Sequence, residues 1–412
     1  MRQQLEVPNS QSRALDIVRE VAAEKDCRPF LVGGPVRDIL LGRPAGDVDL
    51  TLEEGSSTLA RALAKRVEGR VRSYPQFLTY KVTAEGLPEI DIATARKERY
   101  RAPGSLPAVS PGNLEDDLLR RDFSINAIAM DLMNGSFHDP AGGESDLKTR
   151  VIRVLHEKSF VDDPTRVFRA LRLAARLGFS VESHTAQLMR EAIAAGALAT
   201  VSKERLWREL FLAMDEEEAP QVLLALAQQG VLDVLLGQKT DPAAAATLQQ
   251  IRQELATRPD LDRYVLYTGA LLRGTDATGA QLEGSGLSQK RTRGVLQIAH
   301  DVPRLEEALD NTSSERQRFR LFRSVTPELL AMIAAERPRE REYVARYEAF
   351  RRFKLSLRGN ELEVPGGPHV ARALERTREA VFTGEIPPDR ARSFAREMAI
   401  KYLDHEQAAT PK

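Results

Sequence analysis

The pattern of hydrophobic and polar positions predicts a helix near the start of the chain. Leu15, Val18 and Val21 fall on one face at helical spacing, and Ser10 is a residue type that caps helix N-termini. The apolar face ends near Cys27, and residues 29–32 then form a short run that predicts a strand. The first elements are therefore expected to be a helix followed by a strand.

Short strands and amphipathic helices are predicted to alternate up to about residue 150. Gly33 and Gly34 break the first strand, and Gly42 ends the helix that follows it. No GxGxxG sequence follows a predicted strand, so a doubly wound nucleotide-binding fold is not expected. The pattern predicts a small mixed sheet with helices, built from strands at residues 29–32, 48–52, 77–83 and 89–93 and helices at residues 36–41 and 57–66.

Beyond about residue 150 the helical period dominates. Leu206, Leu210 and Met214 recur at four-residue steps, and Trp207 and Phe211 lie on the adjoining row. Further Ala-, Leu-, Arg- and Glu-rich segments follow, separated by Pro or Gly, with no clean repeat period. We interpret the apolar rows as core. The predicted fold class is an α+β N-terminal part followed by an all-α remainder.

Composition and charge narrow the class of protein. The 412 residues include 60 Lys and Arg, 60 Asp and Glu and a single Cys. A lone Cys excludes a disulfide scaffold, no apolar run is long enough to span a bilayer, and the N-terminus lacks the apolar stretch of a signal peptide. We expect a soluble cytoplasmic protein with no membrane partner. Zero net charge argues against indiscriminate coating of nucleic acid but allows a local basic face.

Two carboxylates in the segment 31–51 indicate metal chemistry. Asp47 and Asp49 are two residues apart in a predicted strand, so both side chains leave it on one face. With Asp91 from a later strand as a third carboxylate, they would form a site for hard divalent cations that also bridge substrate phosphates. A DxD pattern alone is equally compatible with two solvated carboxylates.

A glycine pair and an arginine precede this DxD pattern. Gly33 and Gly34 allow the backbone to approach a ligand closely, and Arg37 lies on the helix that follows. Amide groups and a guanidinium placed there would hold a triphosphate. An ordinary turn is the alternative, but GGxxRD followed nine residues later by DxD favours the functional interpretation.

These motifs resemble a known enzyme family. GG-x-VRD-x-LLG followed by D-x-D is similar to class II tRNA nucleotidyltransferases and bacterial poly(A) polymerases, a branch of the polymerase-β superfamily. Residues 120–127 resemble the family's RRDFTINA block, and residues 162–179 resemble its EDxxR region, with Asp162 where the family usually has Glu. The likeness covers about the first half of the chain in the right order, and residues 359–368 loosely match the family's tail.

The resemblance implies a magnesium-dependent enzyme. It would transfer CMP and/or AMP from CTP or ATP to the 3′ end of tRNA and release pyrophosphate, with Asp47 and Asp49 binding two Mg²⁺ ions. The implied parts are a nucleotidyltransferase head (residues 1–150), a helical neck for base recognition (residues 151–215), a helical body (residues 216–335) and a helical tail for tRNA binding (residues 336–412).

The resemblance also implies the residues that bind the nucleotide. Those in the first block would hold its ribose and phosphates, whereas a capped helix with surface arginines is the plain alternative for residues 120–127. The implied nucleotide-binding residues are Gly33, Gly34, Arg37, Asp38, Arg120, Arg121, Asp122, Asn126, Asp163, Arg166, Arg169 and Arg172.

Asp163 and Arg166 form a pair suited to reading a base. On a helix they would share a face at i, i+3, with a carboxylate that accepts hydrogen bonds beside a guanidinium that donates them. Cytosine and adenine each offer an amine beside an unprotonated ring nitrogen, whereas guanine and uracil present the opposite pattern. Spacing alone favours a surface salt bridge, and the position after the RRDF block favours base recognition.

The segment 95–119 is predicted to be a loop rather than a helix, because Pro103, Gly104, Pro107 and Pro111 interrupt it. In the resembling family, a flexible loop here helps the site change from C to A. This segment departs from the basic, acidic-ended loop of complete CCA-adding enzymes. Addition of CCA, of CC only or of A only therefore stays open, and a surface linker is the plain alternative.

RNA contacts are expected from Arg-rich helices between residues 316 and 354. Arg351, Arg352 and Lys354 are candidate phosphate contacts, but interleaved Glu residues make a solvated helix face an equal alternative. Rival functions are a poly(A) polymerase, a transferase acting on a small hydroxyl compound and a catalytically inactive RNA-binding module. Asp47, Asp49 and Arg37 together argue against the last of these. The sequence does not identify a protein partner.

Overall fold

The computed structural model describes residues 9–44, 46–239, 245–273, 275–352 and 357–408. The chain divides into two compact units, Met1–Lys239 and Thr240–Lys412, and each forms its own core. None of the described helices is long and apolar enough to cross a membrane.

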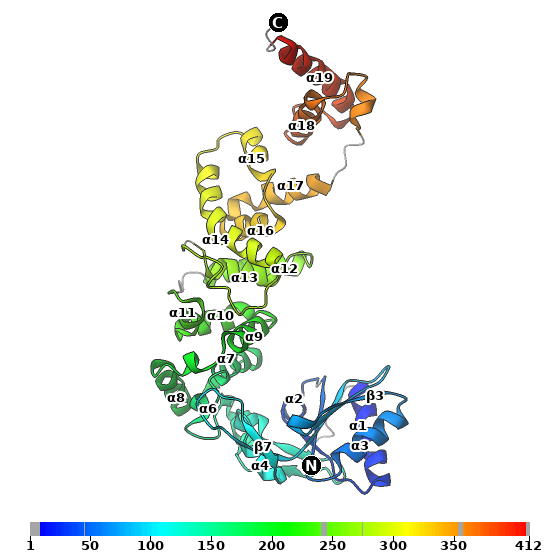
Figure 1. Cartoon of the computed structure of the whole chain (residues 1–412), viewed down its shortest axis with the longest axis vertical. Helices are drawn as coiled ribbons and strands as arrows, with labels where there is room; N and C mark the ends of the chain where they lie inside the picture. Colours follow the sequence, from blue (N-terminus) through cyan, green and yellow to red (C-terminus); the bar gives the residue numbers. More distant parts are fainter. Residues whose placement is uncertain (1–8, 45, 240–244, 274, 353–356, 409–412) are drawn as a thin grey trace. The chain divides into compact units, whose positions relative to one another are not determined.

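The first unit begins with a seven-stranded mixed sheet (Figure 1). Its strand order is β3-β4-β5-β2-β1-β8-β9. Strands β2 and β5 run parallel, and the other neighbouring pairs run antiparallel. The strands are β1 (Phe30–Val32), β2 (Val48–Leu52), β3 (Arg70–Tyr74), β4 (Thr79–Thr83), β5 (Ile90–Thr94), β8 (Ala129–Asp131) and β9 (Phe137–His138).

Apolar alternation holds this sheet against its helices. Leu50 in β2 and Ile92 in β5 are buried opposite each other, so Asp49 and Asp91 leave their strands on the other face. Helices α1 (Asn9–Glu24) and α3 (Ser56–Arg66) lie side by side, and both pack on the sheet (Figure 1). The predicted α+β start of the chain is confirmed.

The segment that Pro and Gly predicted to be a loop contains a hairpin. Its strands are β6 (Arg96–Arg99) and β7 (Ala108–Pro111), which pair antiparallel, and only the connection between them is irregular. Pro111 pairs with Arg96 at the open end of this short two-stranded sheet, where a proline is tolerated. The prediction of a loop over the whole segment is therefore wrong, because proline at a strand end does not exclude pairing and because the last residues of the segment form helix α4 (Leu114–Leu119).

Helices make up most of the rest of the first unit, as predicted. A small parallel pair, β10 (Val151–Ile152) with β11 (Ser180–Val181), interrupts them. Leu206, Trp207 and Leu210 are buried, which confirms the apolar rows as core. The helices are α2 (Gly34–Leu40), α4 (Leu114–Leu119), α5 (Gly143–Thr149), α6 (Ser159–Asp162), α7 (Arg166–Leu177), α8 (Ser183–Ala194), α9 (Lys203–Met214), α10 (Ala219–Gln228) and α11 (Val231–Leu236), with 3-10 turns at Pro75–Phe77, Ser124–Asn126 and Ala197–Thr200.

The second unit is helical throughout its described residues. An aromatic cluster joins three of its helices, because Phe319, Phe322, Tyr347 and Phe382 contact one another, mostly edge to face. The helices are α12 (Ala245–Thr257), α13 (Arg263–Leu271), α14 (Gln289–Asp310), α15 (Glu315–Phe322), α16 (Pro327–Glu336), α17 (Arg341–Arg352), α18 (Pro368–Phe382) and α19 (Ala391–Ala408), with 3-10 turns at Pro338–Glu340, Gly359–Leu362 and Pro388–Arg390.

Candidate active site

The predicted carboxylates meet at one end of the sheet. Asp49 in β2 is the direct register partner of Asp91 in the parallel strand β5, and Asp47 stands one residue before β2. The Gln11 Nε2 atom donates a 2.9 Å hydrogen bond to the Asp47 carbonyl and fixes that residue's backbone. We call this region, with the nearby Gly33 turn, the Asp49 end of the sheet.

The negative charges at the Asp49 end are only partly compensated. Burial, and then the neighbouring Asp91 carboxylate, raise the pKa of Asp49 to about 6, while Arg121 and Lys81 act in the opposite direction. Burial is also the main cause of the raised pKa of Asp91, whose Oδ1 atom lies 3.5 Å from Lys81 Nζ. Three carboxylates gathered in this way would be stabilised by added positive charge.

The donor set at the Asp49 end fits a hard divalent cation. Asp91 Oδ1 is buried without a hydrogen-bond partner, since the 3.5 Å to Lys81 is too long for a good one. Within the described ranges, no three carboxylate, imidazole or thiol groups already converge on a metal-sized site. The carboxylates could thus supply part of a coordination shell, with the remaining oxygens coming from water or phosphate, as Mg²⁺ commonly requires.

The Gly33 turn lies beneath an arginine of the RRDF block. Gly33 has φ of +75°, which strains any side chain, and a Cβ atom added there would stand 2.6 Å from Arg121 Nη1, so that this guanidinium would have to move. Arg121 Nη2 donates to Asp117 Oδ2 at 3.0 Å, while its Nε atom is buried without a hydrogen-bond partner. This guanidinium lies close enough to Asp49 to lower its pKa, and it has donor capacity left for an anionic ligand.

A chain of hydrogen bonds links Arg37 to helix α7. Arg37 is 6% exposed, and it donates to Asp38 Oδ1 at 2.8 Å and to Asn126 Oδ1 at 2.8 Å. Asn126 in turn donates to Asp122 Oδ1 at 3.0 Å, and Arg169 Nε donates to Asp122 Oδ2 at 2.9 Å. The structure thus brings together five of the predicted residues from three separate segments of the sequence.

Asp122 is the central acceptor of this chain of hydrogen bonds. Burial alone would raise its pKa, but Arg169 and the Asn126 amide hold the pKa at about 2. Both of its oxygens are engaged, since Oδ1 also accepts from the Phe123 backbone N–H at 2.9 Å. Asp122 is therefore placed to orient Asn126 and Arg169 rather than to accept a ligand directly.

Arg120 is bound within the protein. Its guanidinium donates to Asp117 Oδ1 at 2.7 Å and to Glu98 Oε1 at 2.8 Å, and so ties helix α4 to strand β6. Arg172 is engaged in a similar way, with Nη1 donating to Glu209 Oε2 at 2.9 Å. Of the predicted nucleotide-binding arginines, these two are the ones with guanidinium groups most occupied by carboxylates.

Asp163 and Arg166 do not lie on one helix, so that prediction is wrong. Asp163 has extended backbone geometry just after α6, Arg166 opens α7, and Pro164 between them disfavours a continuous helix. Arg166 is 4% exposed and donates to Ser159 Oγ at 2.6 Å and to the Arg120 carbonyl at 3.0 Å. The two residues are close in the chain, but each has other partners.

Asp163 presents one oxygen to the protein and one away from it. Its Oδ1 atom accepts from the Thr165 hydroxyl at 2.7 Å, from the Thr165 backbone N–H at 3.2 Å and from Arg205 Nη2 at 3.0 Å. Among the described residues, Oδ2 has no hydrogen-bond partner. The carboxylate is thus held by one side and offers an acceptor on the other.

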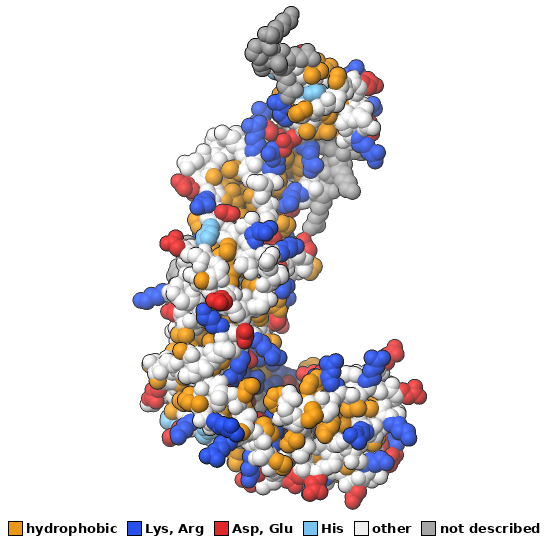
Figure 2. Space-filling model, viewed as in Figure 1, with side chains coloured by type: hydrophobic (Ala, Val, Ile, Leu, Met, Phe, Trp, Pro, Cys, Tyr) orange, Lys and Arg blue, Asp and Glu red, His pale blue; other side chains and the backbone are white. Residues whose placement is uncertain are grey.

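The predicted RNA contacts lie in the second unit and are only partly described. Arg351 is exposed, and its Nη1 atom donates to the Val325 carbonyl at 3.2 Å. Lys354 and the side chain of Arg352 lie outside the described residues. Figure 2 shows Lys and Arg side chains interspersed with Asp and Glu on the visible face of this unit, as expected of a solvated helix surface.

Sequence reasoning missed Lys81 and Arg205. Lys81 reaches Asp91 because β4 pairs with β5, a pairing of neighbouring strands that an alternation pattern could have suggested. Arg205 reaches Asp163 from helix α9, and no local pattern in Ser202–Leu206 indicates this contact. The contact of Lys81 could therefore have been predicted from the sequence, and the contact of Arg205 could not.

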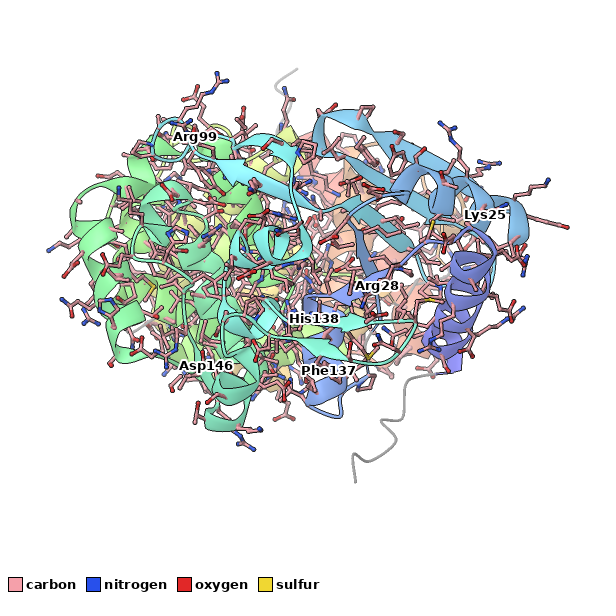
Figure 3. All side chains as sticks on the ribbon, turned by 90° about the horizontal axis from the view of Figure 1, so that it is seen from below. Lys25, Arg28, Arg99, Phe137, His138 and Asp146 are labelled. Carbon is pink, nitrogen blue, oxygen red and sulfur yellow. The ribbon has the colours of Figure 1, made fainter. Side chains whose placement is uncertain are left out.

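A cavity of about 920 Å³ opens at the opposite end of the sheet. It is lined by residues at the start of β1 and the end of β9, including Arg28 and His138 (Figure 3), and by Glu53 after β2. It contains none of the predicted site residues. We place the active site at the Asp49 end despite this cavity, because the paired carboxylates of Asp49 and Asp91 and the Arg121 guanidinium lie there.

Comparisons with known proteins agree with the geometry. A family model described as the poly(A) polymerase head domain matches residues 29–153, and one described as a probable RNA- and SrmB-binding site of polymerase A matches residues 178–248. A solved tRNA-processing enzyme in an apo form is 30% identical with a TM-score of 0.70, over 82% of this chain and 96% of that one.

Two curated relatives are longer than this chain. The A-adding tRNA nucleotidyltransferase of Geobacter sulfurreducens is 30% identical over 394 residues, which are 89% of this chain and 44% of that protein. A multifunctional CCA protein of Xylella fastidiosa is 39% identical over 216 residues, which are 51% of this chain and 50% of that protein. The chain thus spans about half the length of the curated relatives it matches.

Proposed function

Because the chain belongs to the family of tRNA nucleotidyltransferases and bacterial poly(A) polymerases, we propose that it adds nucleotides to the 3′ end of tRNA. The proposed reaction transfers CMP and/or AMP from the nucleoside triphosphate to the terminal hydroxyl without a template. The observation that supports it most is the pairing of Asp49 with Asp91 opposite Arg121 and Lys81.

The proposed site needs divalent metal, which this family generally uses. Asp47 and Asp49, with Asp91 beside them, would hold two Mg²⁺ ions. Bound metal would favour the ionised 3′-hydroxyl and stabilise charge on the departing pyrophosphate. Arg121, with its unpartnered Nε atom, would bind the triphosphate, and the Gly33 turn below it leaves the room that a side chain would fill.

Base selection is proposed for Asp163 and Arg166. The free Oδ2 atom of Asp163 would accept a hydrogen bond from the exocyclic amine of adenine or cytosine. Arg166 would donate to the adjacent ring nitrogen, since its bonds to Ser159 and Arg120 leave further N–H groups. Asp122 would act by holding Asn126 and Arg169 in place, and Arg37 would hold the first turn of α2 at the triphosphate.

Addition of the terminal A is the form of the reaction that we favour. An A-adding relative matches 89% of this chain, and the segment 95–119 lacks the basic, acidic-ended loop pattern of complete CCA-adding enzymes. Complete CCA addition is the second candidate, because a multifunctional CCA protein also matches about half of this chain, at 39% identity.

We retain the four-part division, with the head at residues 1–150, neck at 151–215, body at 216–335 and tail at 336–412, as part of this proposal. The matched head model at residues 29–153 supports the first boundary. Arg351, Arg352 and Lys354 remain proposed phosphate contacts for the tRNA. A cytoplasmic location belongs to the same proposal, since tRNA and nucleoside triphosphates are abundant there.

Three tRNA transcripts test the proposal directly. They end before CCA, after the first C and after CC, and each is incubated with the full chain, Mg²⁺ and CTP, ATP or both. Growth of only the CC-ended transcript by one A is the expected result. Extension of all three to CCA would instead establish the complete enzyme, and arrest at CC the CC-adding form. A long A ladder would identify a poly(A) polymerase, and no extension would contradict nucleotidyl transfer.

A further inference from the structure

The connection between β6 and β7 is anchored at a single glycine. Gly104 donates its N–H to the Asp162 carbonyl at 3.2 Å and accepts from Arg205 Nη1 at 2.7 Å. Its φ is +68°, and an added Cβ would stand 2.3 Å from Thr200 Oγ1 and 2.8 Å from the Thr200 carbonyl. Only glycine fits this contact, so the connection docks on the helical part of the unit at a defined point.

Arg205 binds this glycine and Asp163 at the same time. One terminal nitrogen donates to the Gly104 carbonyl and the other to Asp163 Oδ1 at 3.0 Å. A planar guanidinium presents its two terminal N–H groups in a fixed geometry, so the position of the connection and the position of the carboxylate are set by one rigid group. The Arg205 side chain is 31% exposed and that of Asp163 is 20% exposed, so both border solvent.

We propose that Arg205 is a positioning residue that sets nucleotide selectivity by holding Asp163 while it clamps the docked Gly104. This inference rests on the proposed role of Asp163 in reading the base. By occupying Oδ1, Arg205 leaves Oδ2, which has no hydrogen-bond partner among the described residues, available to the base. Thr165 holds Oδ1 from within its own turn, so Asp163 stays folded without Arg205 but loses its charged partner.

Two variants disrupt the contact between Arg205 and Gly104, one at each residue. Arg205→Gln removes the charge and the forked donors, and Gly104→Ala pushes the connection away from Thr200. Each variant has a matched control, in which the same type of substitution is made at another position of the first unit. Arg208→Gln lies on the same helix at an exposed position, and Gly86→Ala has φ of +73° with no atom within 4 Å of the added Cβ.

The readout is the ratio of kcat/KM for ATP to that for GTP on the CC-ended tRNA. We expect Arg205→Gln to lower this ratio by about tenfold, as the loss of one charged hydrogen bond predicts, mainly through KM for ATP. Gly104→Ala should lower the ratio in the same direction. Arg208→Gln and Gly86→Ala should leave it at the wild-type value. In an Asp163→Ala background, Arg205→Gln should have no further effect on the ratio.

An unchanged ratio in both clamp variants, or a full additional loss in the Asp163→Ala background, would overturn the inference. If Arg205→Gln does not fold, as judged by its thermal unfolding, Gly104→Ala against Gly86→Ala decides the question. A wild-type chain that is active and selective but indifferent to these changes would refute the role of Arg205 alone. A wild-type chain that transfers no nucleotide would refute the proposed function and this inference with it.

Discussion

Two clusters of charged residues, one in each unit, are built on opposite principles. At the Asp49 end of the sheet, carboxylates of like charge face one another with little compensation, and the pKa of Asp49 is raised to about 6 by burial and by Asp91. Between α15 and α18, Glu379 is 5% exposed at its side chain, and Arg316 Nε and Arg320 Nε lie 2.7 and 3.0 Å from its two oxygens.

This difference distinguishes charged side chains that remain available to a ligand from charged side chains that pair with one another and stabilise the fold. In the second cluster, the arginines already have carboxylate partners, including Arg318 with Glu340 at 3.1 Å and Arg376 with Glu385. In the first, the carboxylates lack enough cations among the described residues, and Asp91 Oδ1 is buried without a hydrogen bond. A count of charges along the sequence cannot distinguish these two arrangements.

The largest expected effect comes from removing a carboxylate at the Asp49 end. Asp49→Asn should lower nucleotide transfer to tRNA by at least about a thousandfold. The metal would lose a carboxylate ligand, and the charge on the departing pyrophosphate would be less well stabilised. Its melting temperature should not fall, since the change relieves repulsion between buried like charges. Primer extension and thermal unfolding measure the two effects. Glu85→Gln, at an exposed turn of the same sheet, should leave both unchanged, and full activity of Asp49→Asn would contradict the metal assignment.

The equivalent change in the second unit should have the reverse result. Glu379→Gln removes a buried carboxylate that accepts from two part-exposed guanidiniums, and the lost charged hydrogen bonds should cost about 2 kcal/mol of unfolding free energy. Transfer by the protein that remains folded should be unaffected. Urea denaturation gives the free energy, and Glu363→Gln, whose exposed carboxylate pairs with Arg396, should cost under about 1 kcal/mol. Equal losses in the two variants would show that burial of Glu379 does not matter.

A smaller effect is expected on base choice. Asp163→Ala removes the proposed acceptor of the exocyclic amine and should reduce discrimination against GTP and UTP by about tenfold or more. The measurement is kcat/KM for each nucleoside triphosphate on one tRNA. Asp162→Ala provides a neighbouring carboxylate as control, because the backbone carbonyl of Asp162 that holds Gly104 survives that change. Unchanged selectivity in Asp163→Ala would leave this residue as a structural partner of Arg205.

The smallest effect is expected from the proposed RNA contacts. Charge reversal of Arg351 together with Arg352 should weaken tRNA binding about threefold to tenfold and reduce the slope of log affinity against log salt by about one to two. Filter binding over a range of salt concentrations measures both. Arg61→Glu, exposed on α3 of the first unit, is the matched reversal and should change neither. An unaltered slope would remove α17 from the RNA footprint.

Local sequence determined most of the Asp49 end. The alternation around Val48 and Ile90 predicted both strands, and the DxD spacing placed Asp47 and Asp49 together, because such patterns depend on neighbouring residues. The prediction failed at Asp163 and Arg166, where Pro164 separates two helices, and at the β6–β7 hairpin. It also could not find Arg205, since that contact joins α9 to residues 42 positions away through tertiary packing alone.

The parallel pairing of β2 with β5 has a further consequence for how this site can change over time. Asp49 faces Asp91 through the same ladder that buries Leu50 opposite Ile92, so the two carboxylates and the core share one register. Inserting or deleting one residue within either strand would turn the carboxylate toward the core and an apolar side chain toward the ligand. Insertions and deletions should therefore be confined to the turns. The two strands must keep their number of residues, because this number holds both carboxylates on the face that meets the ligand.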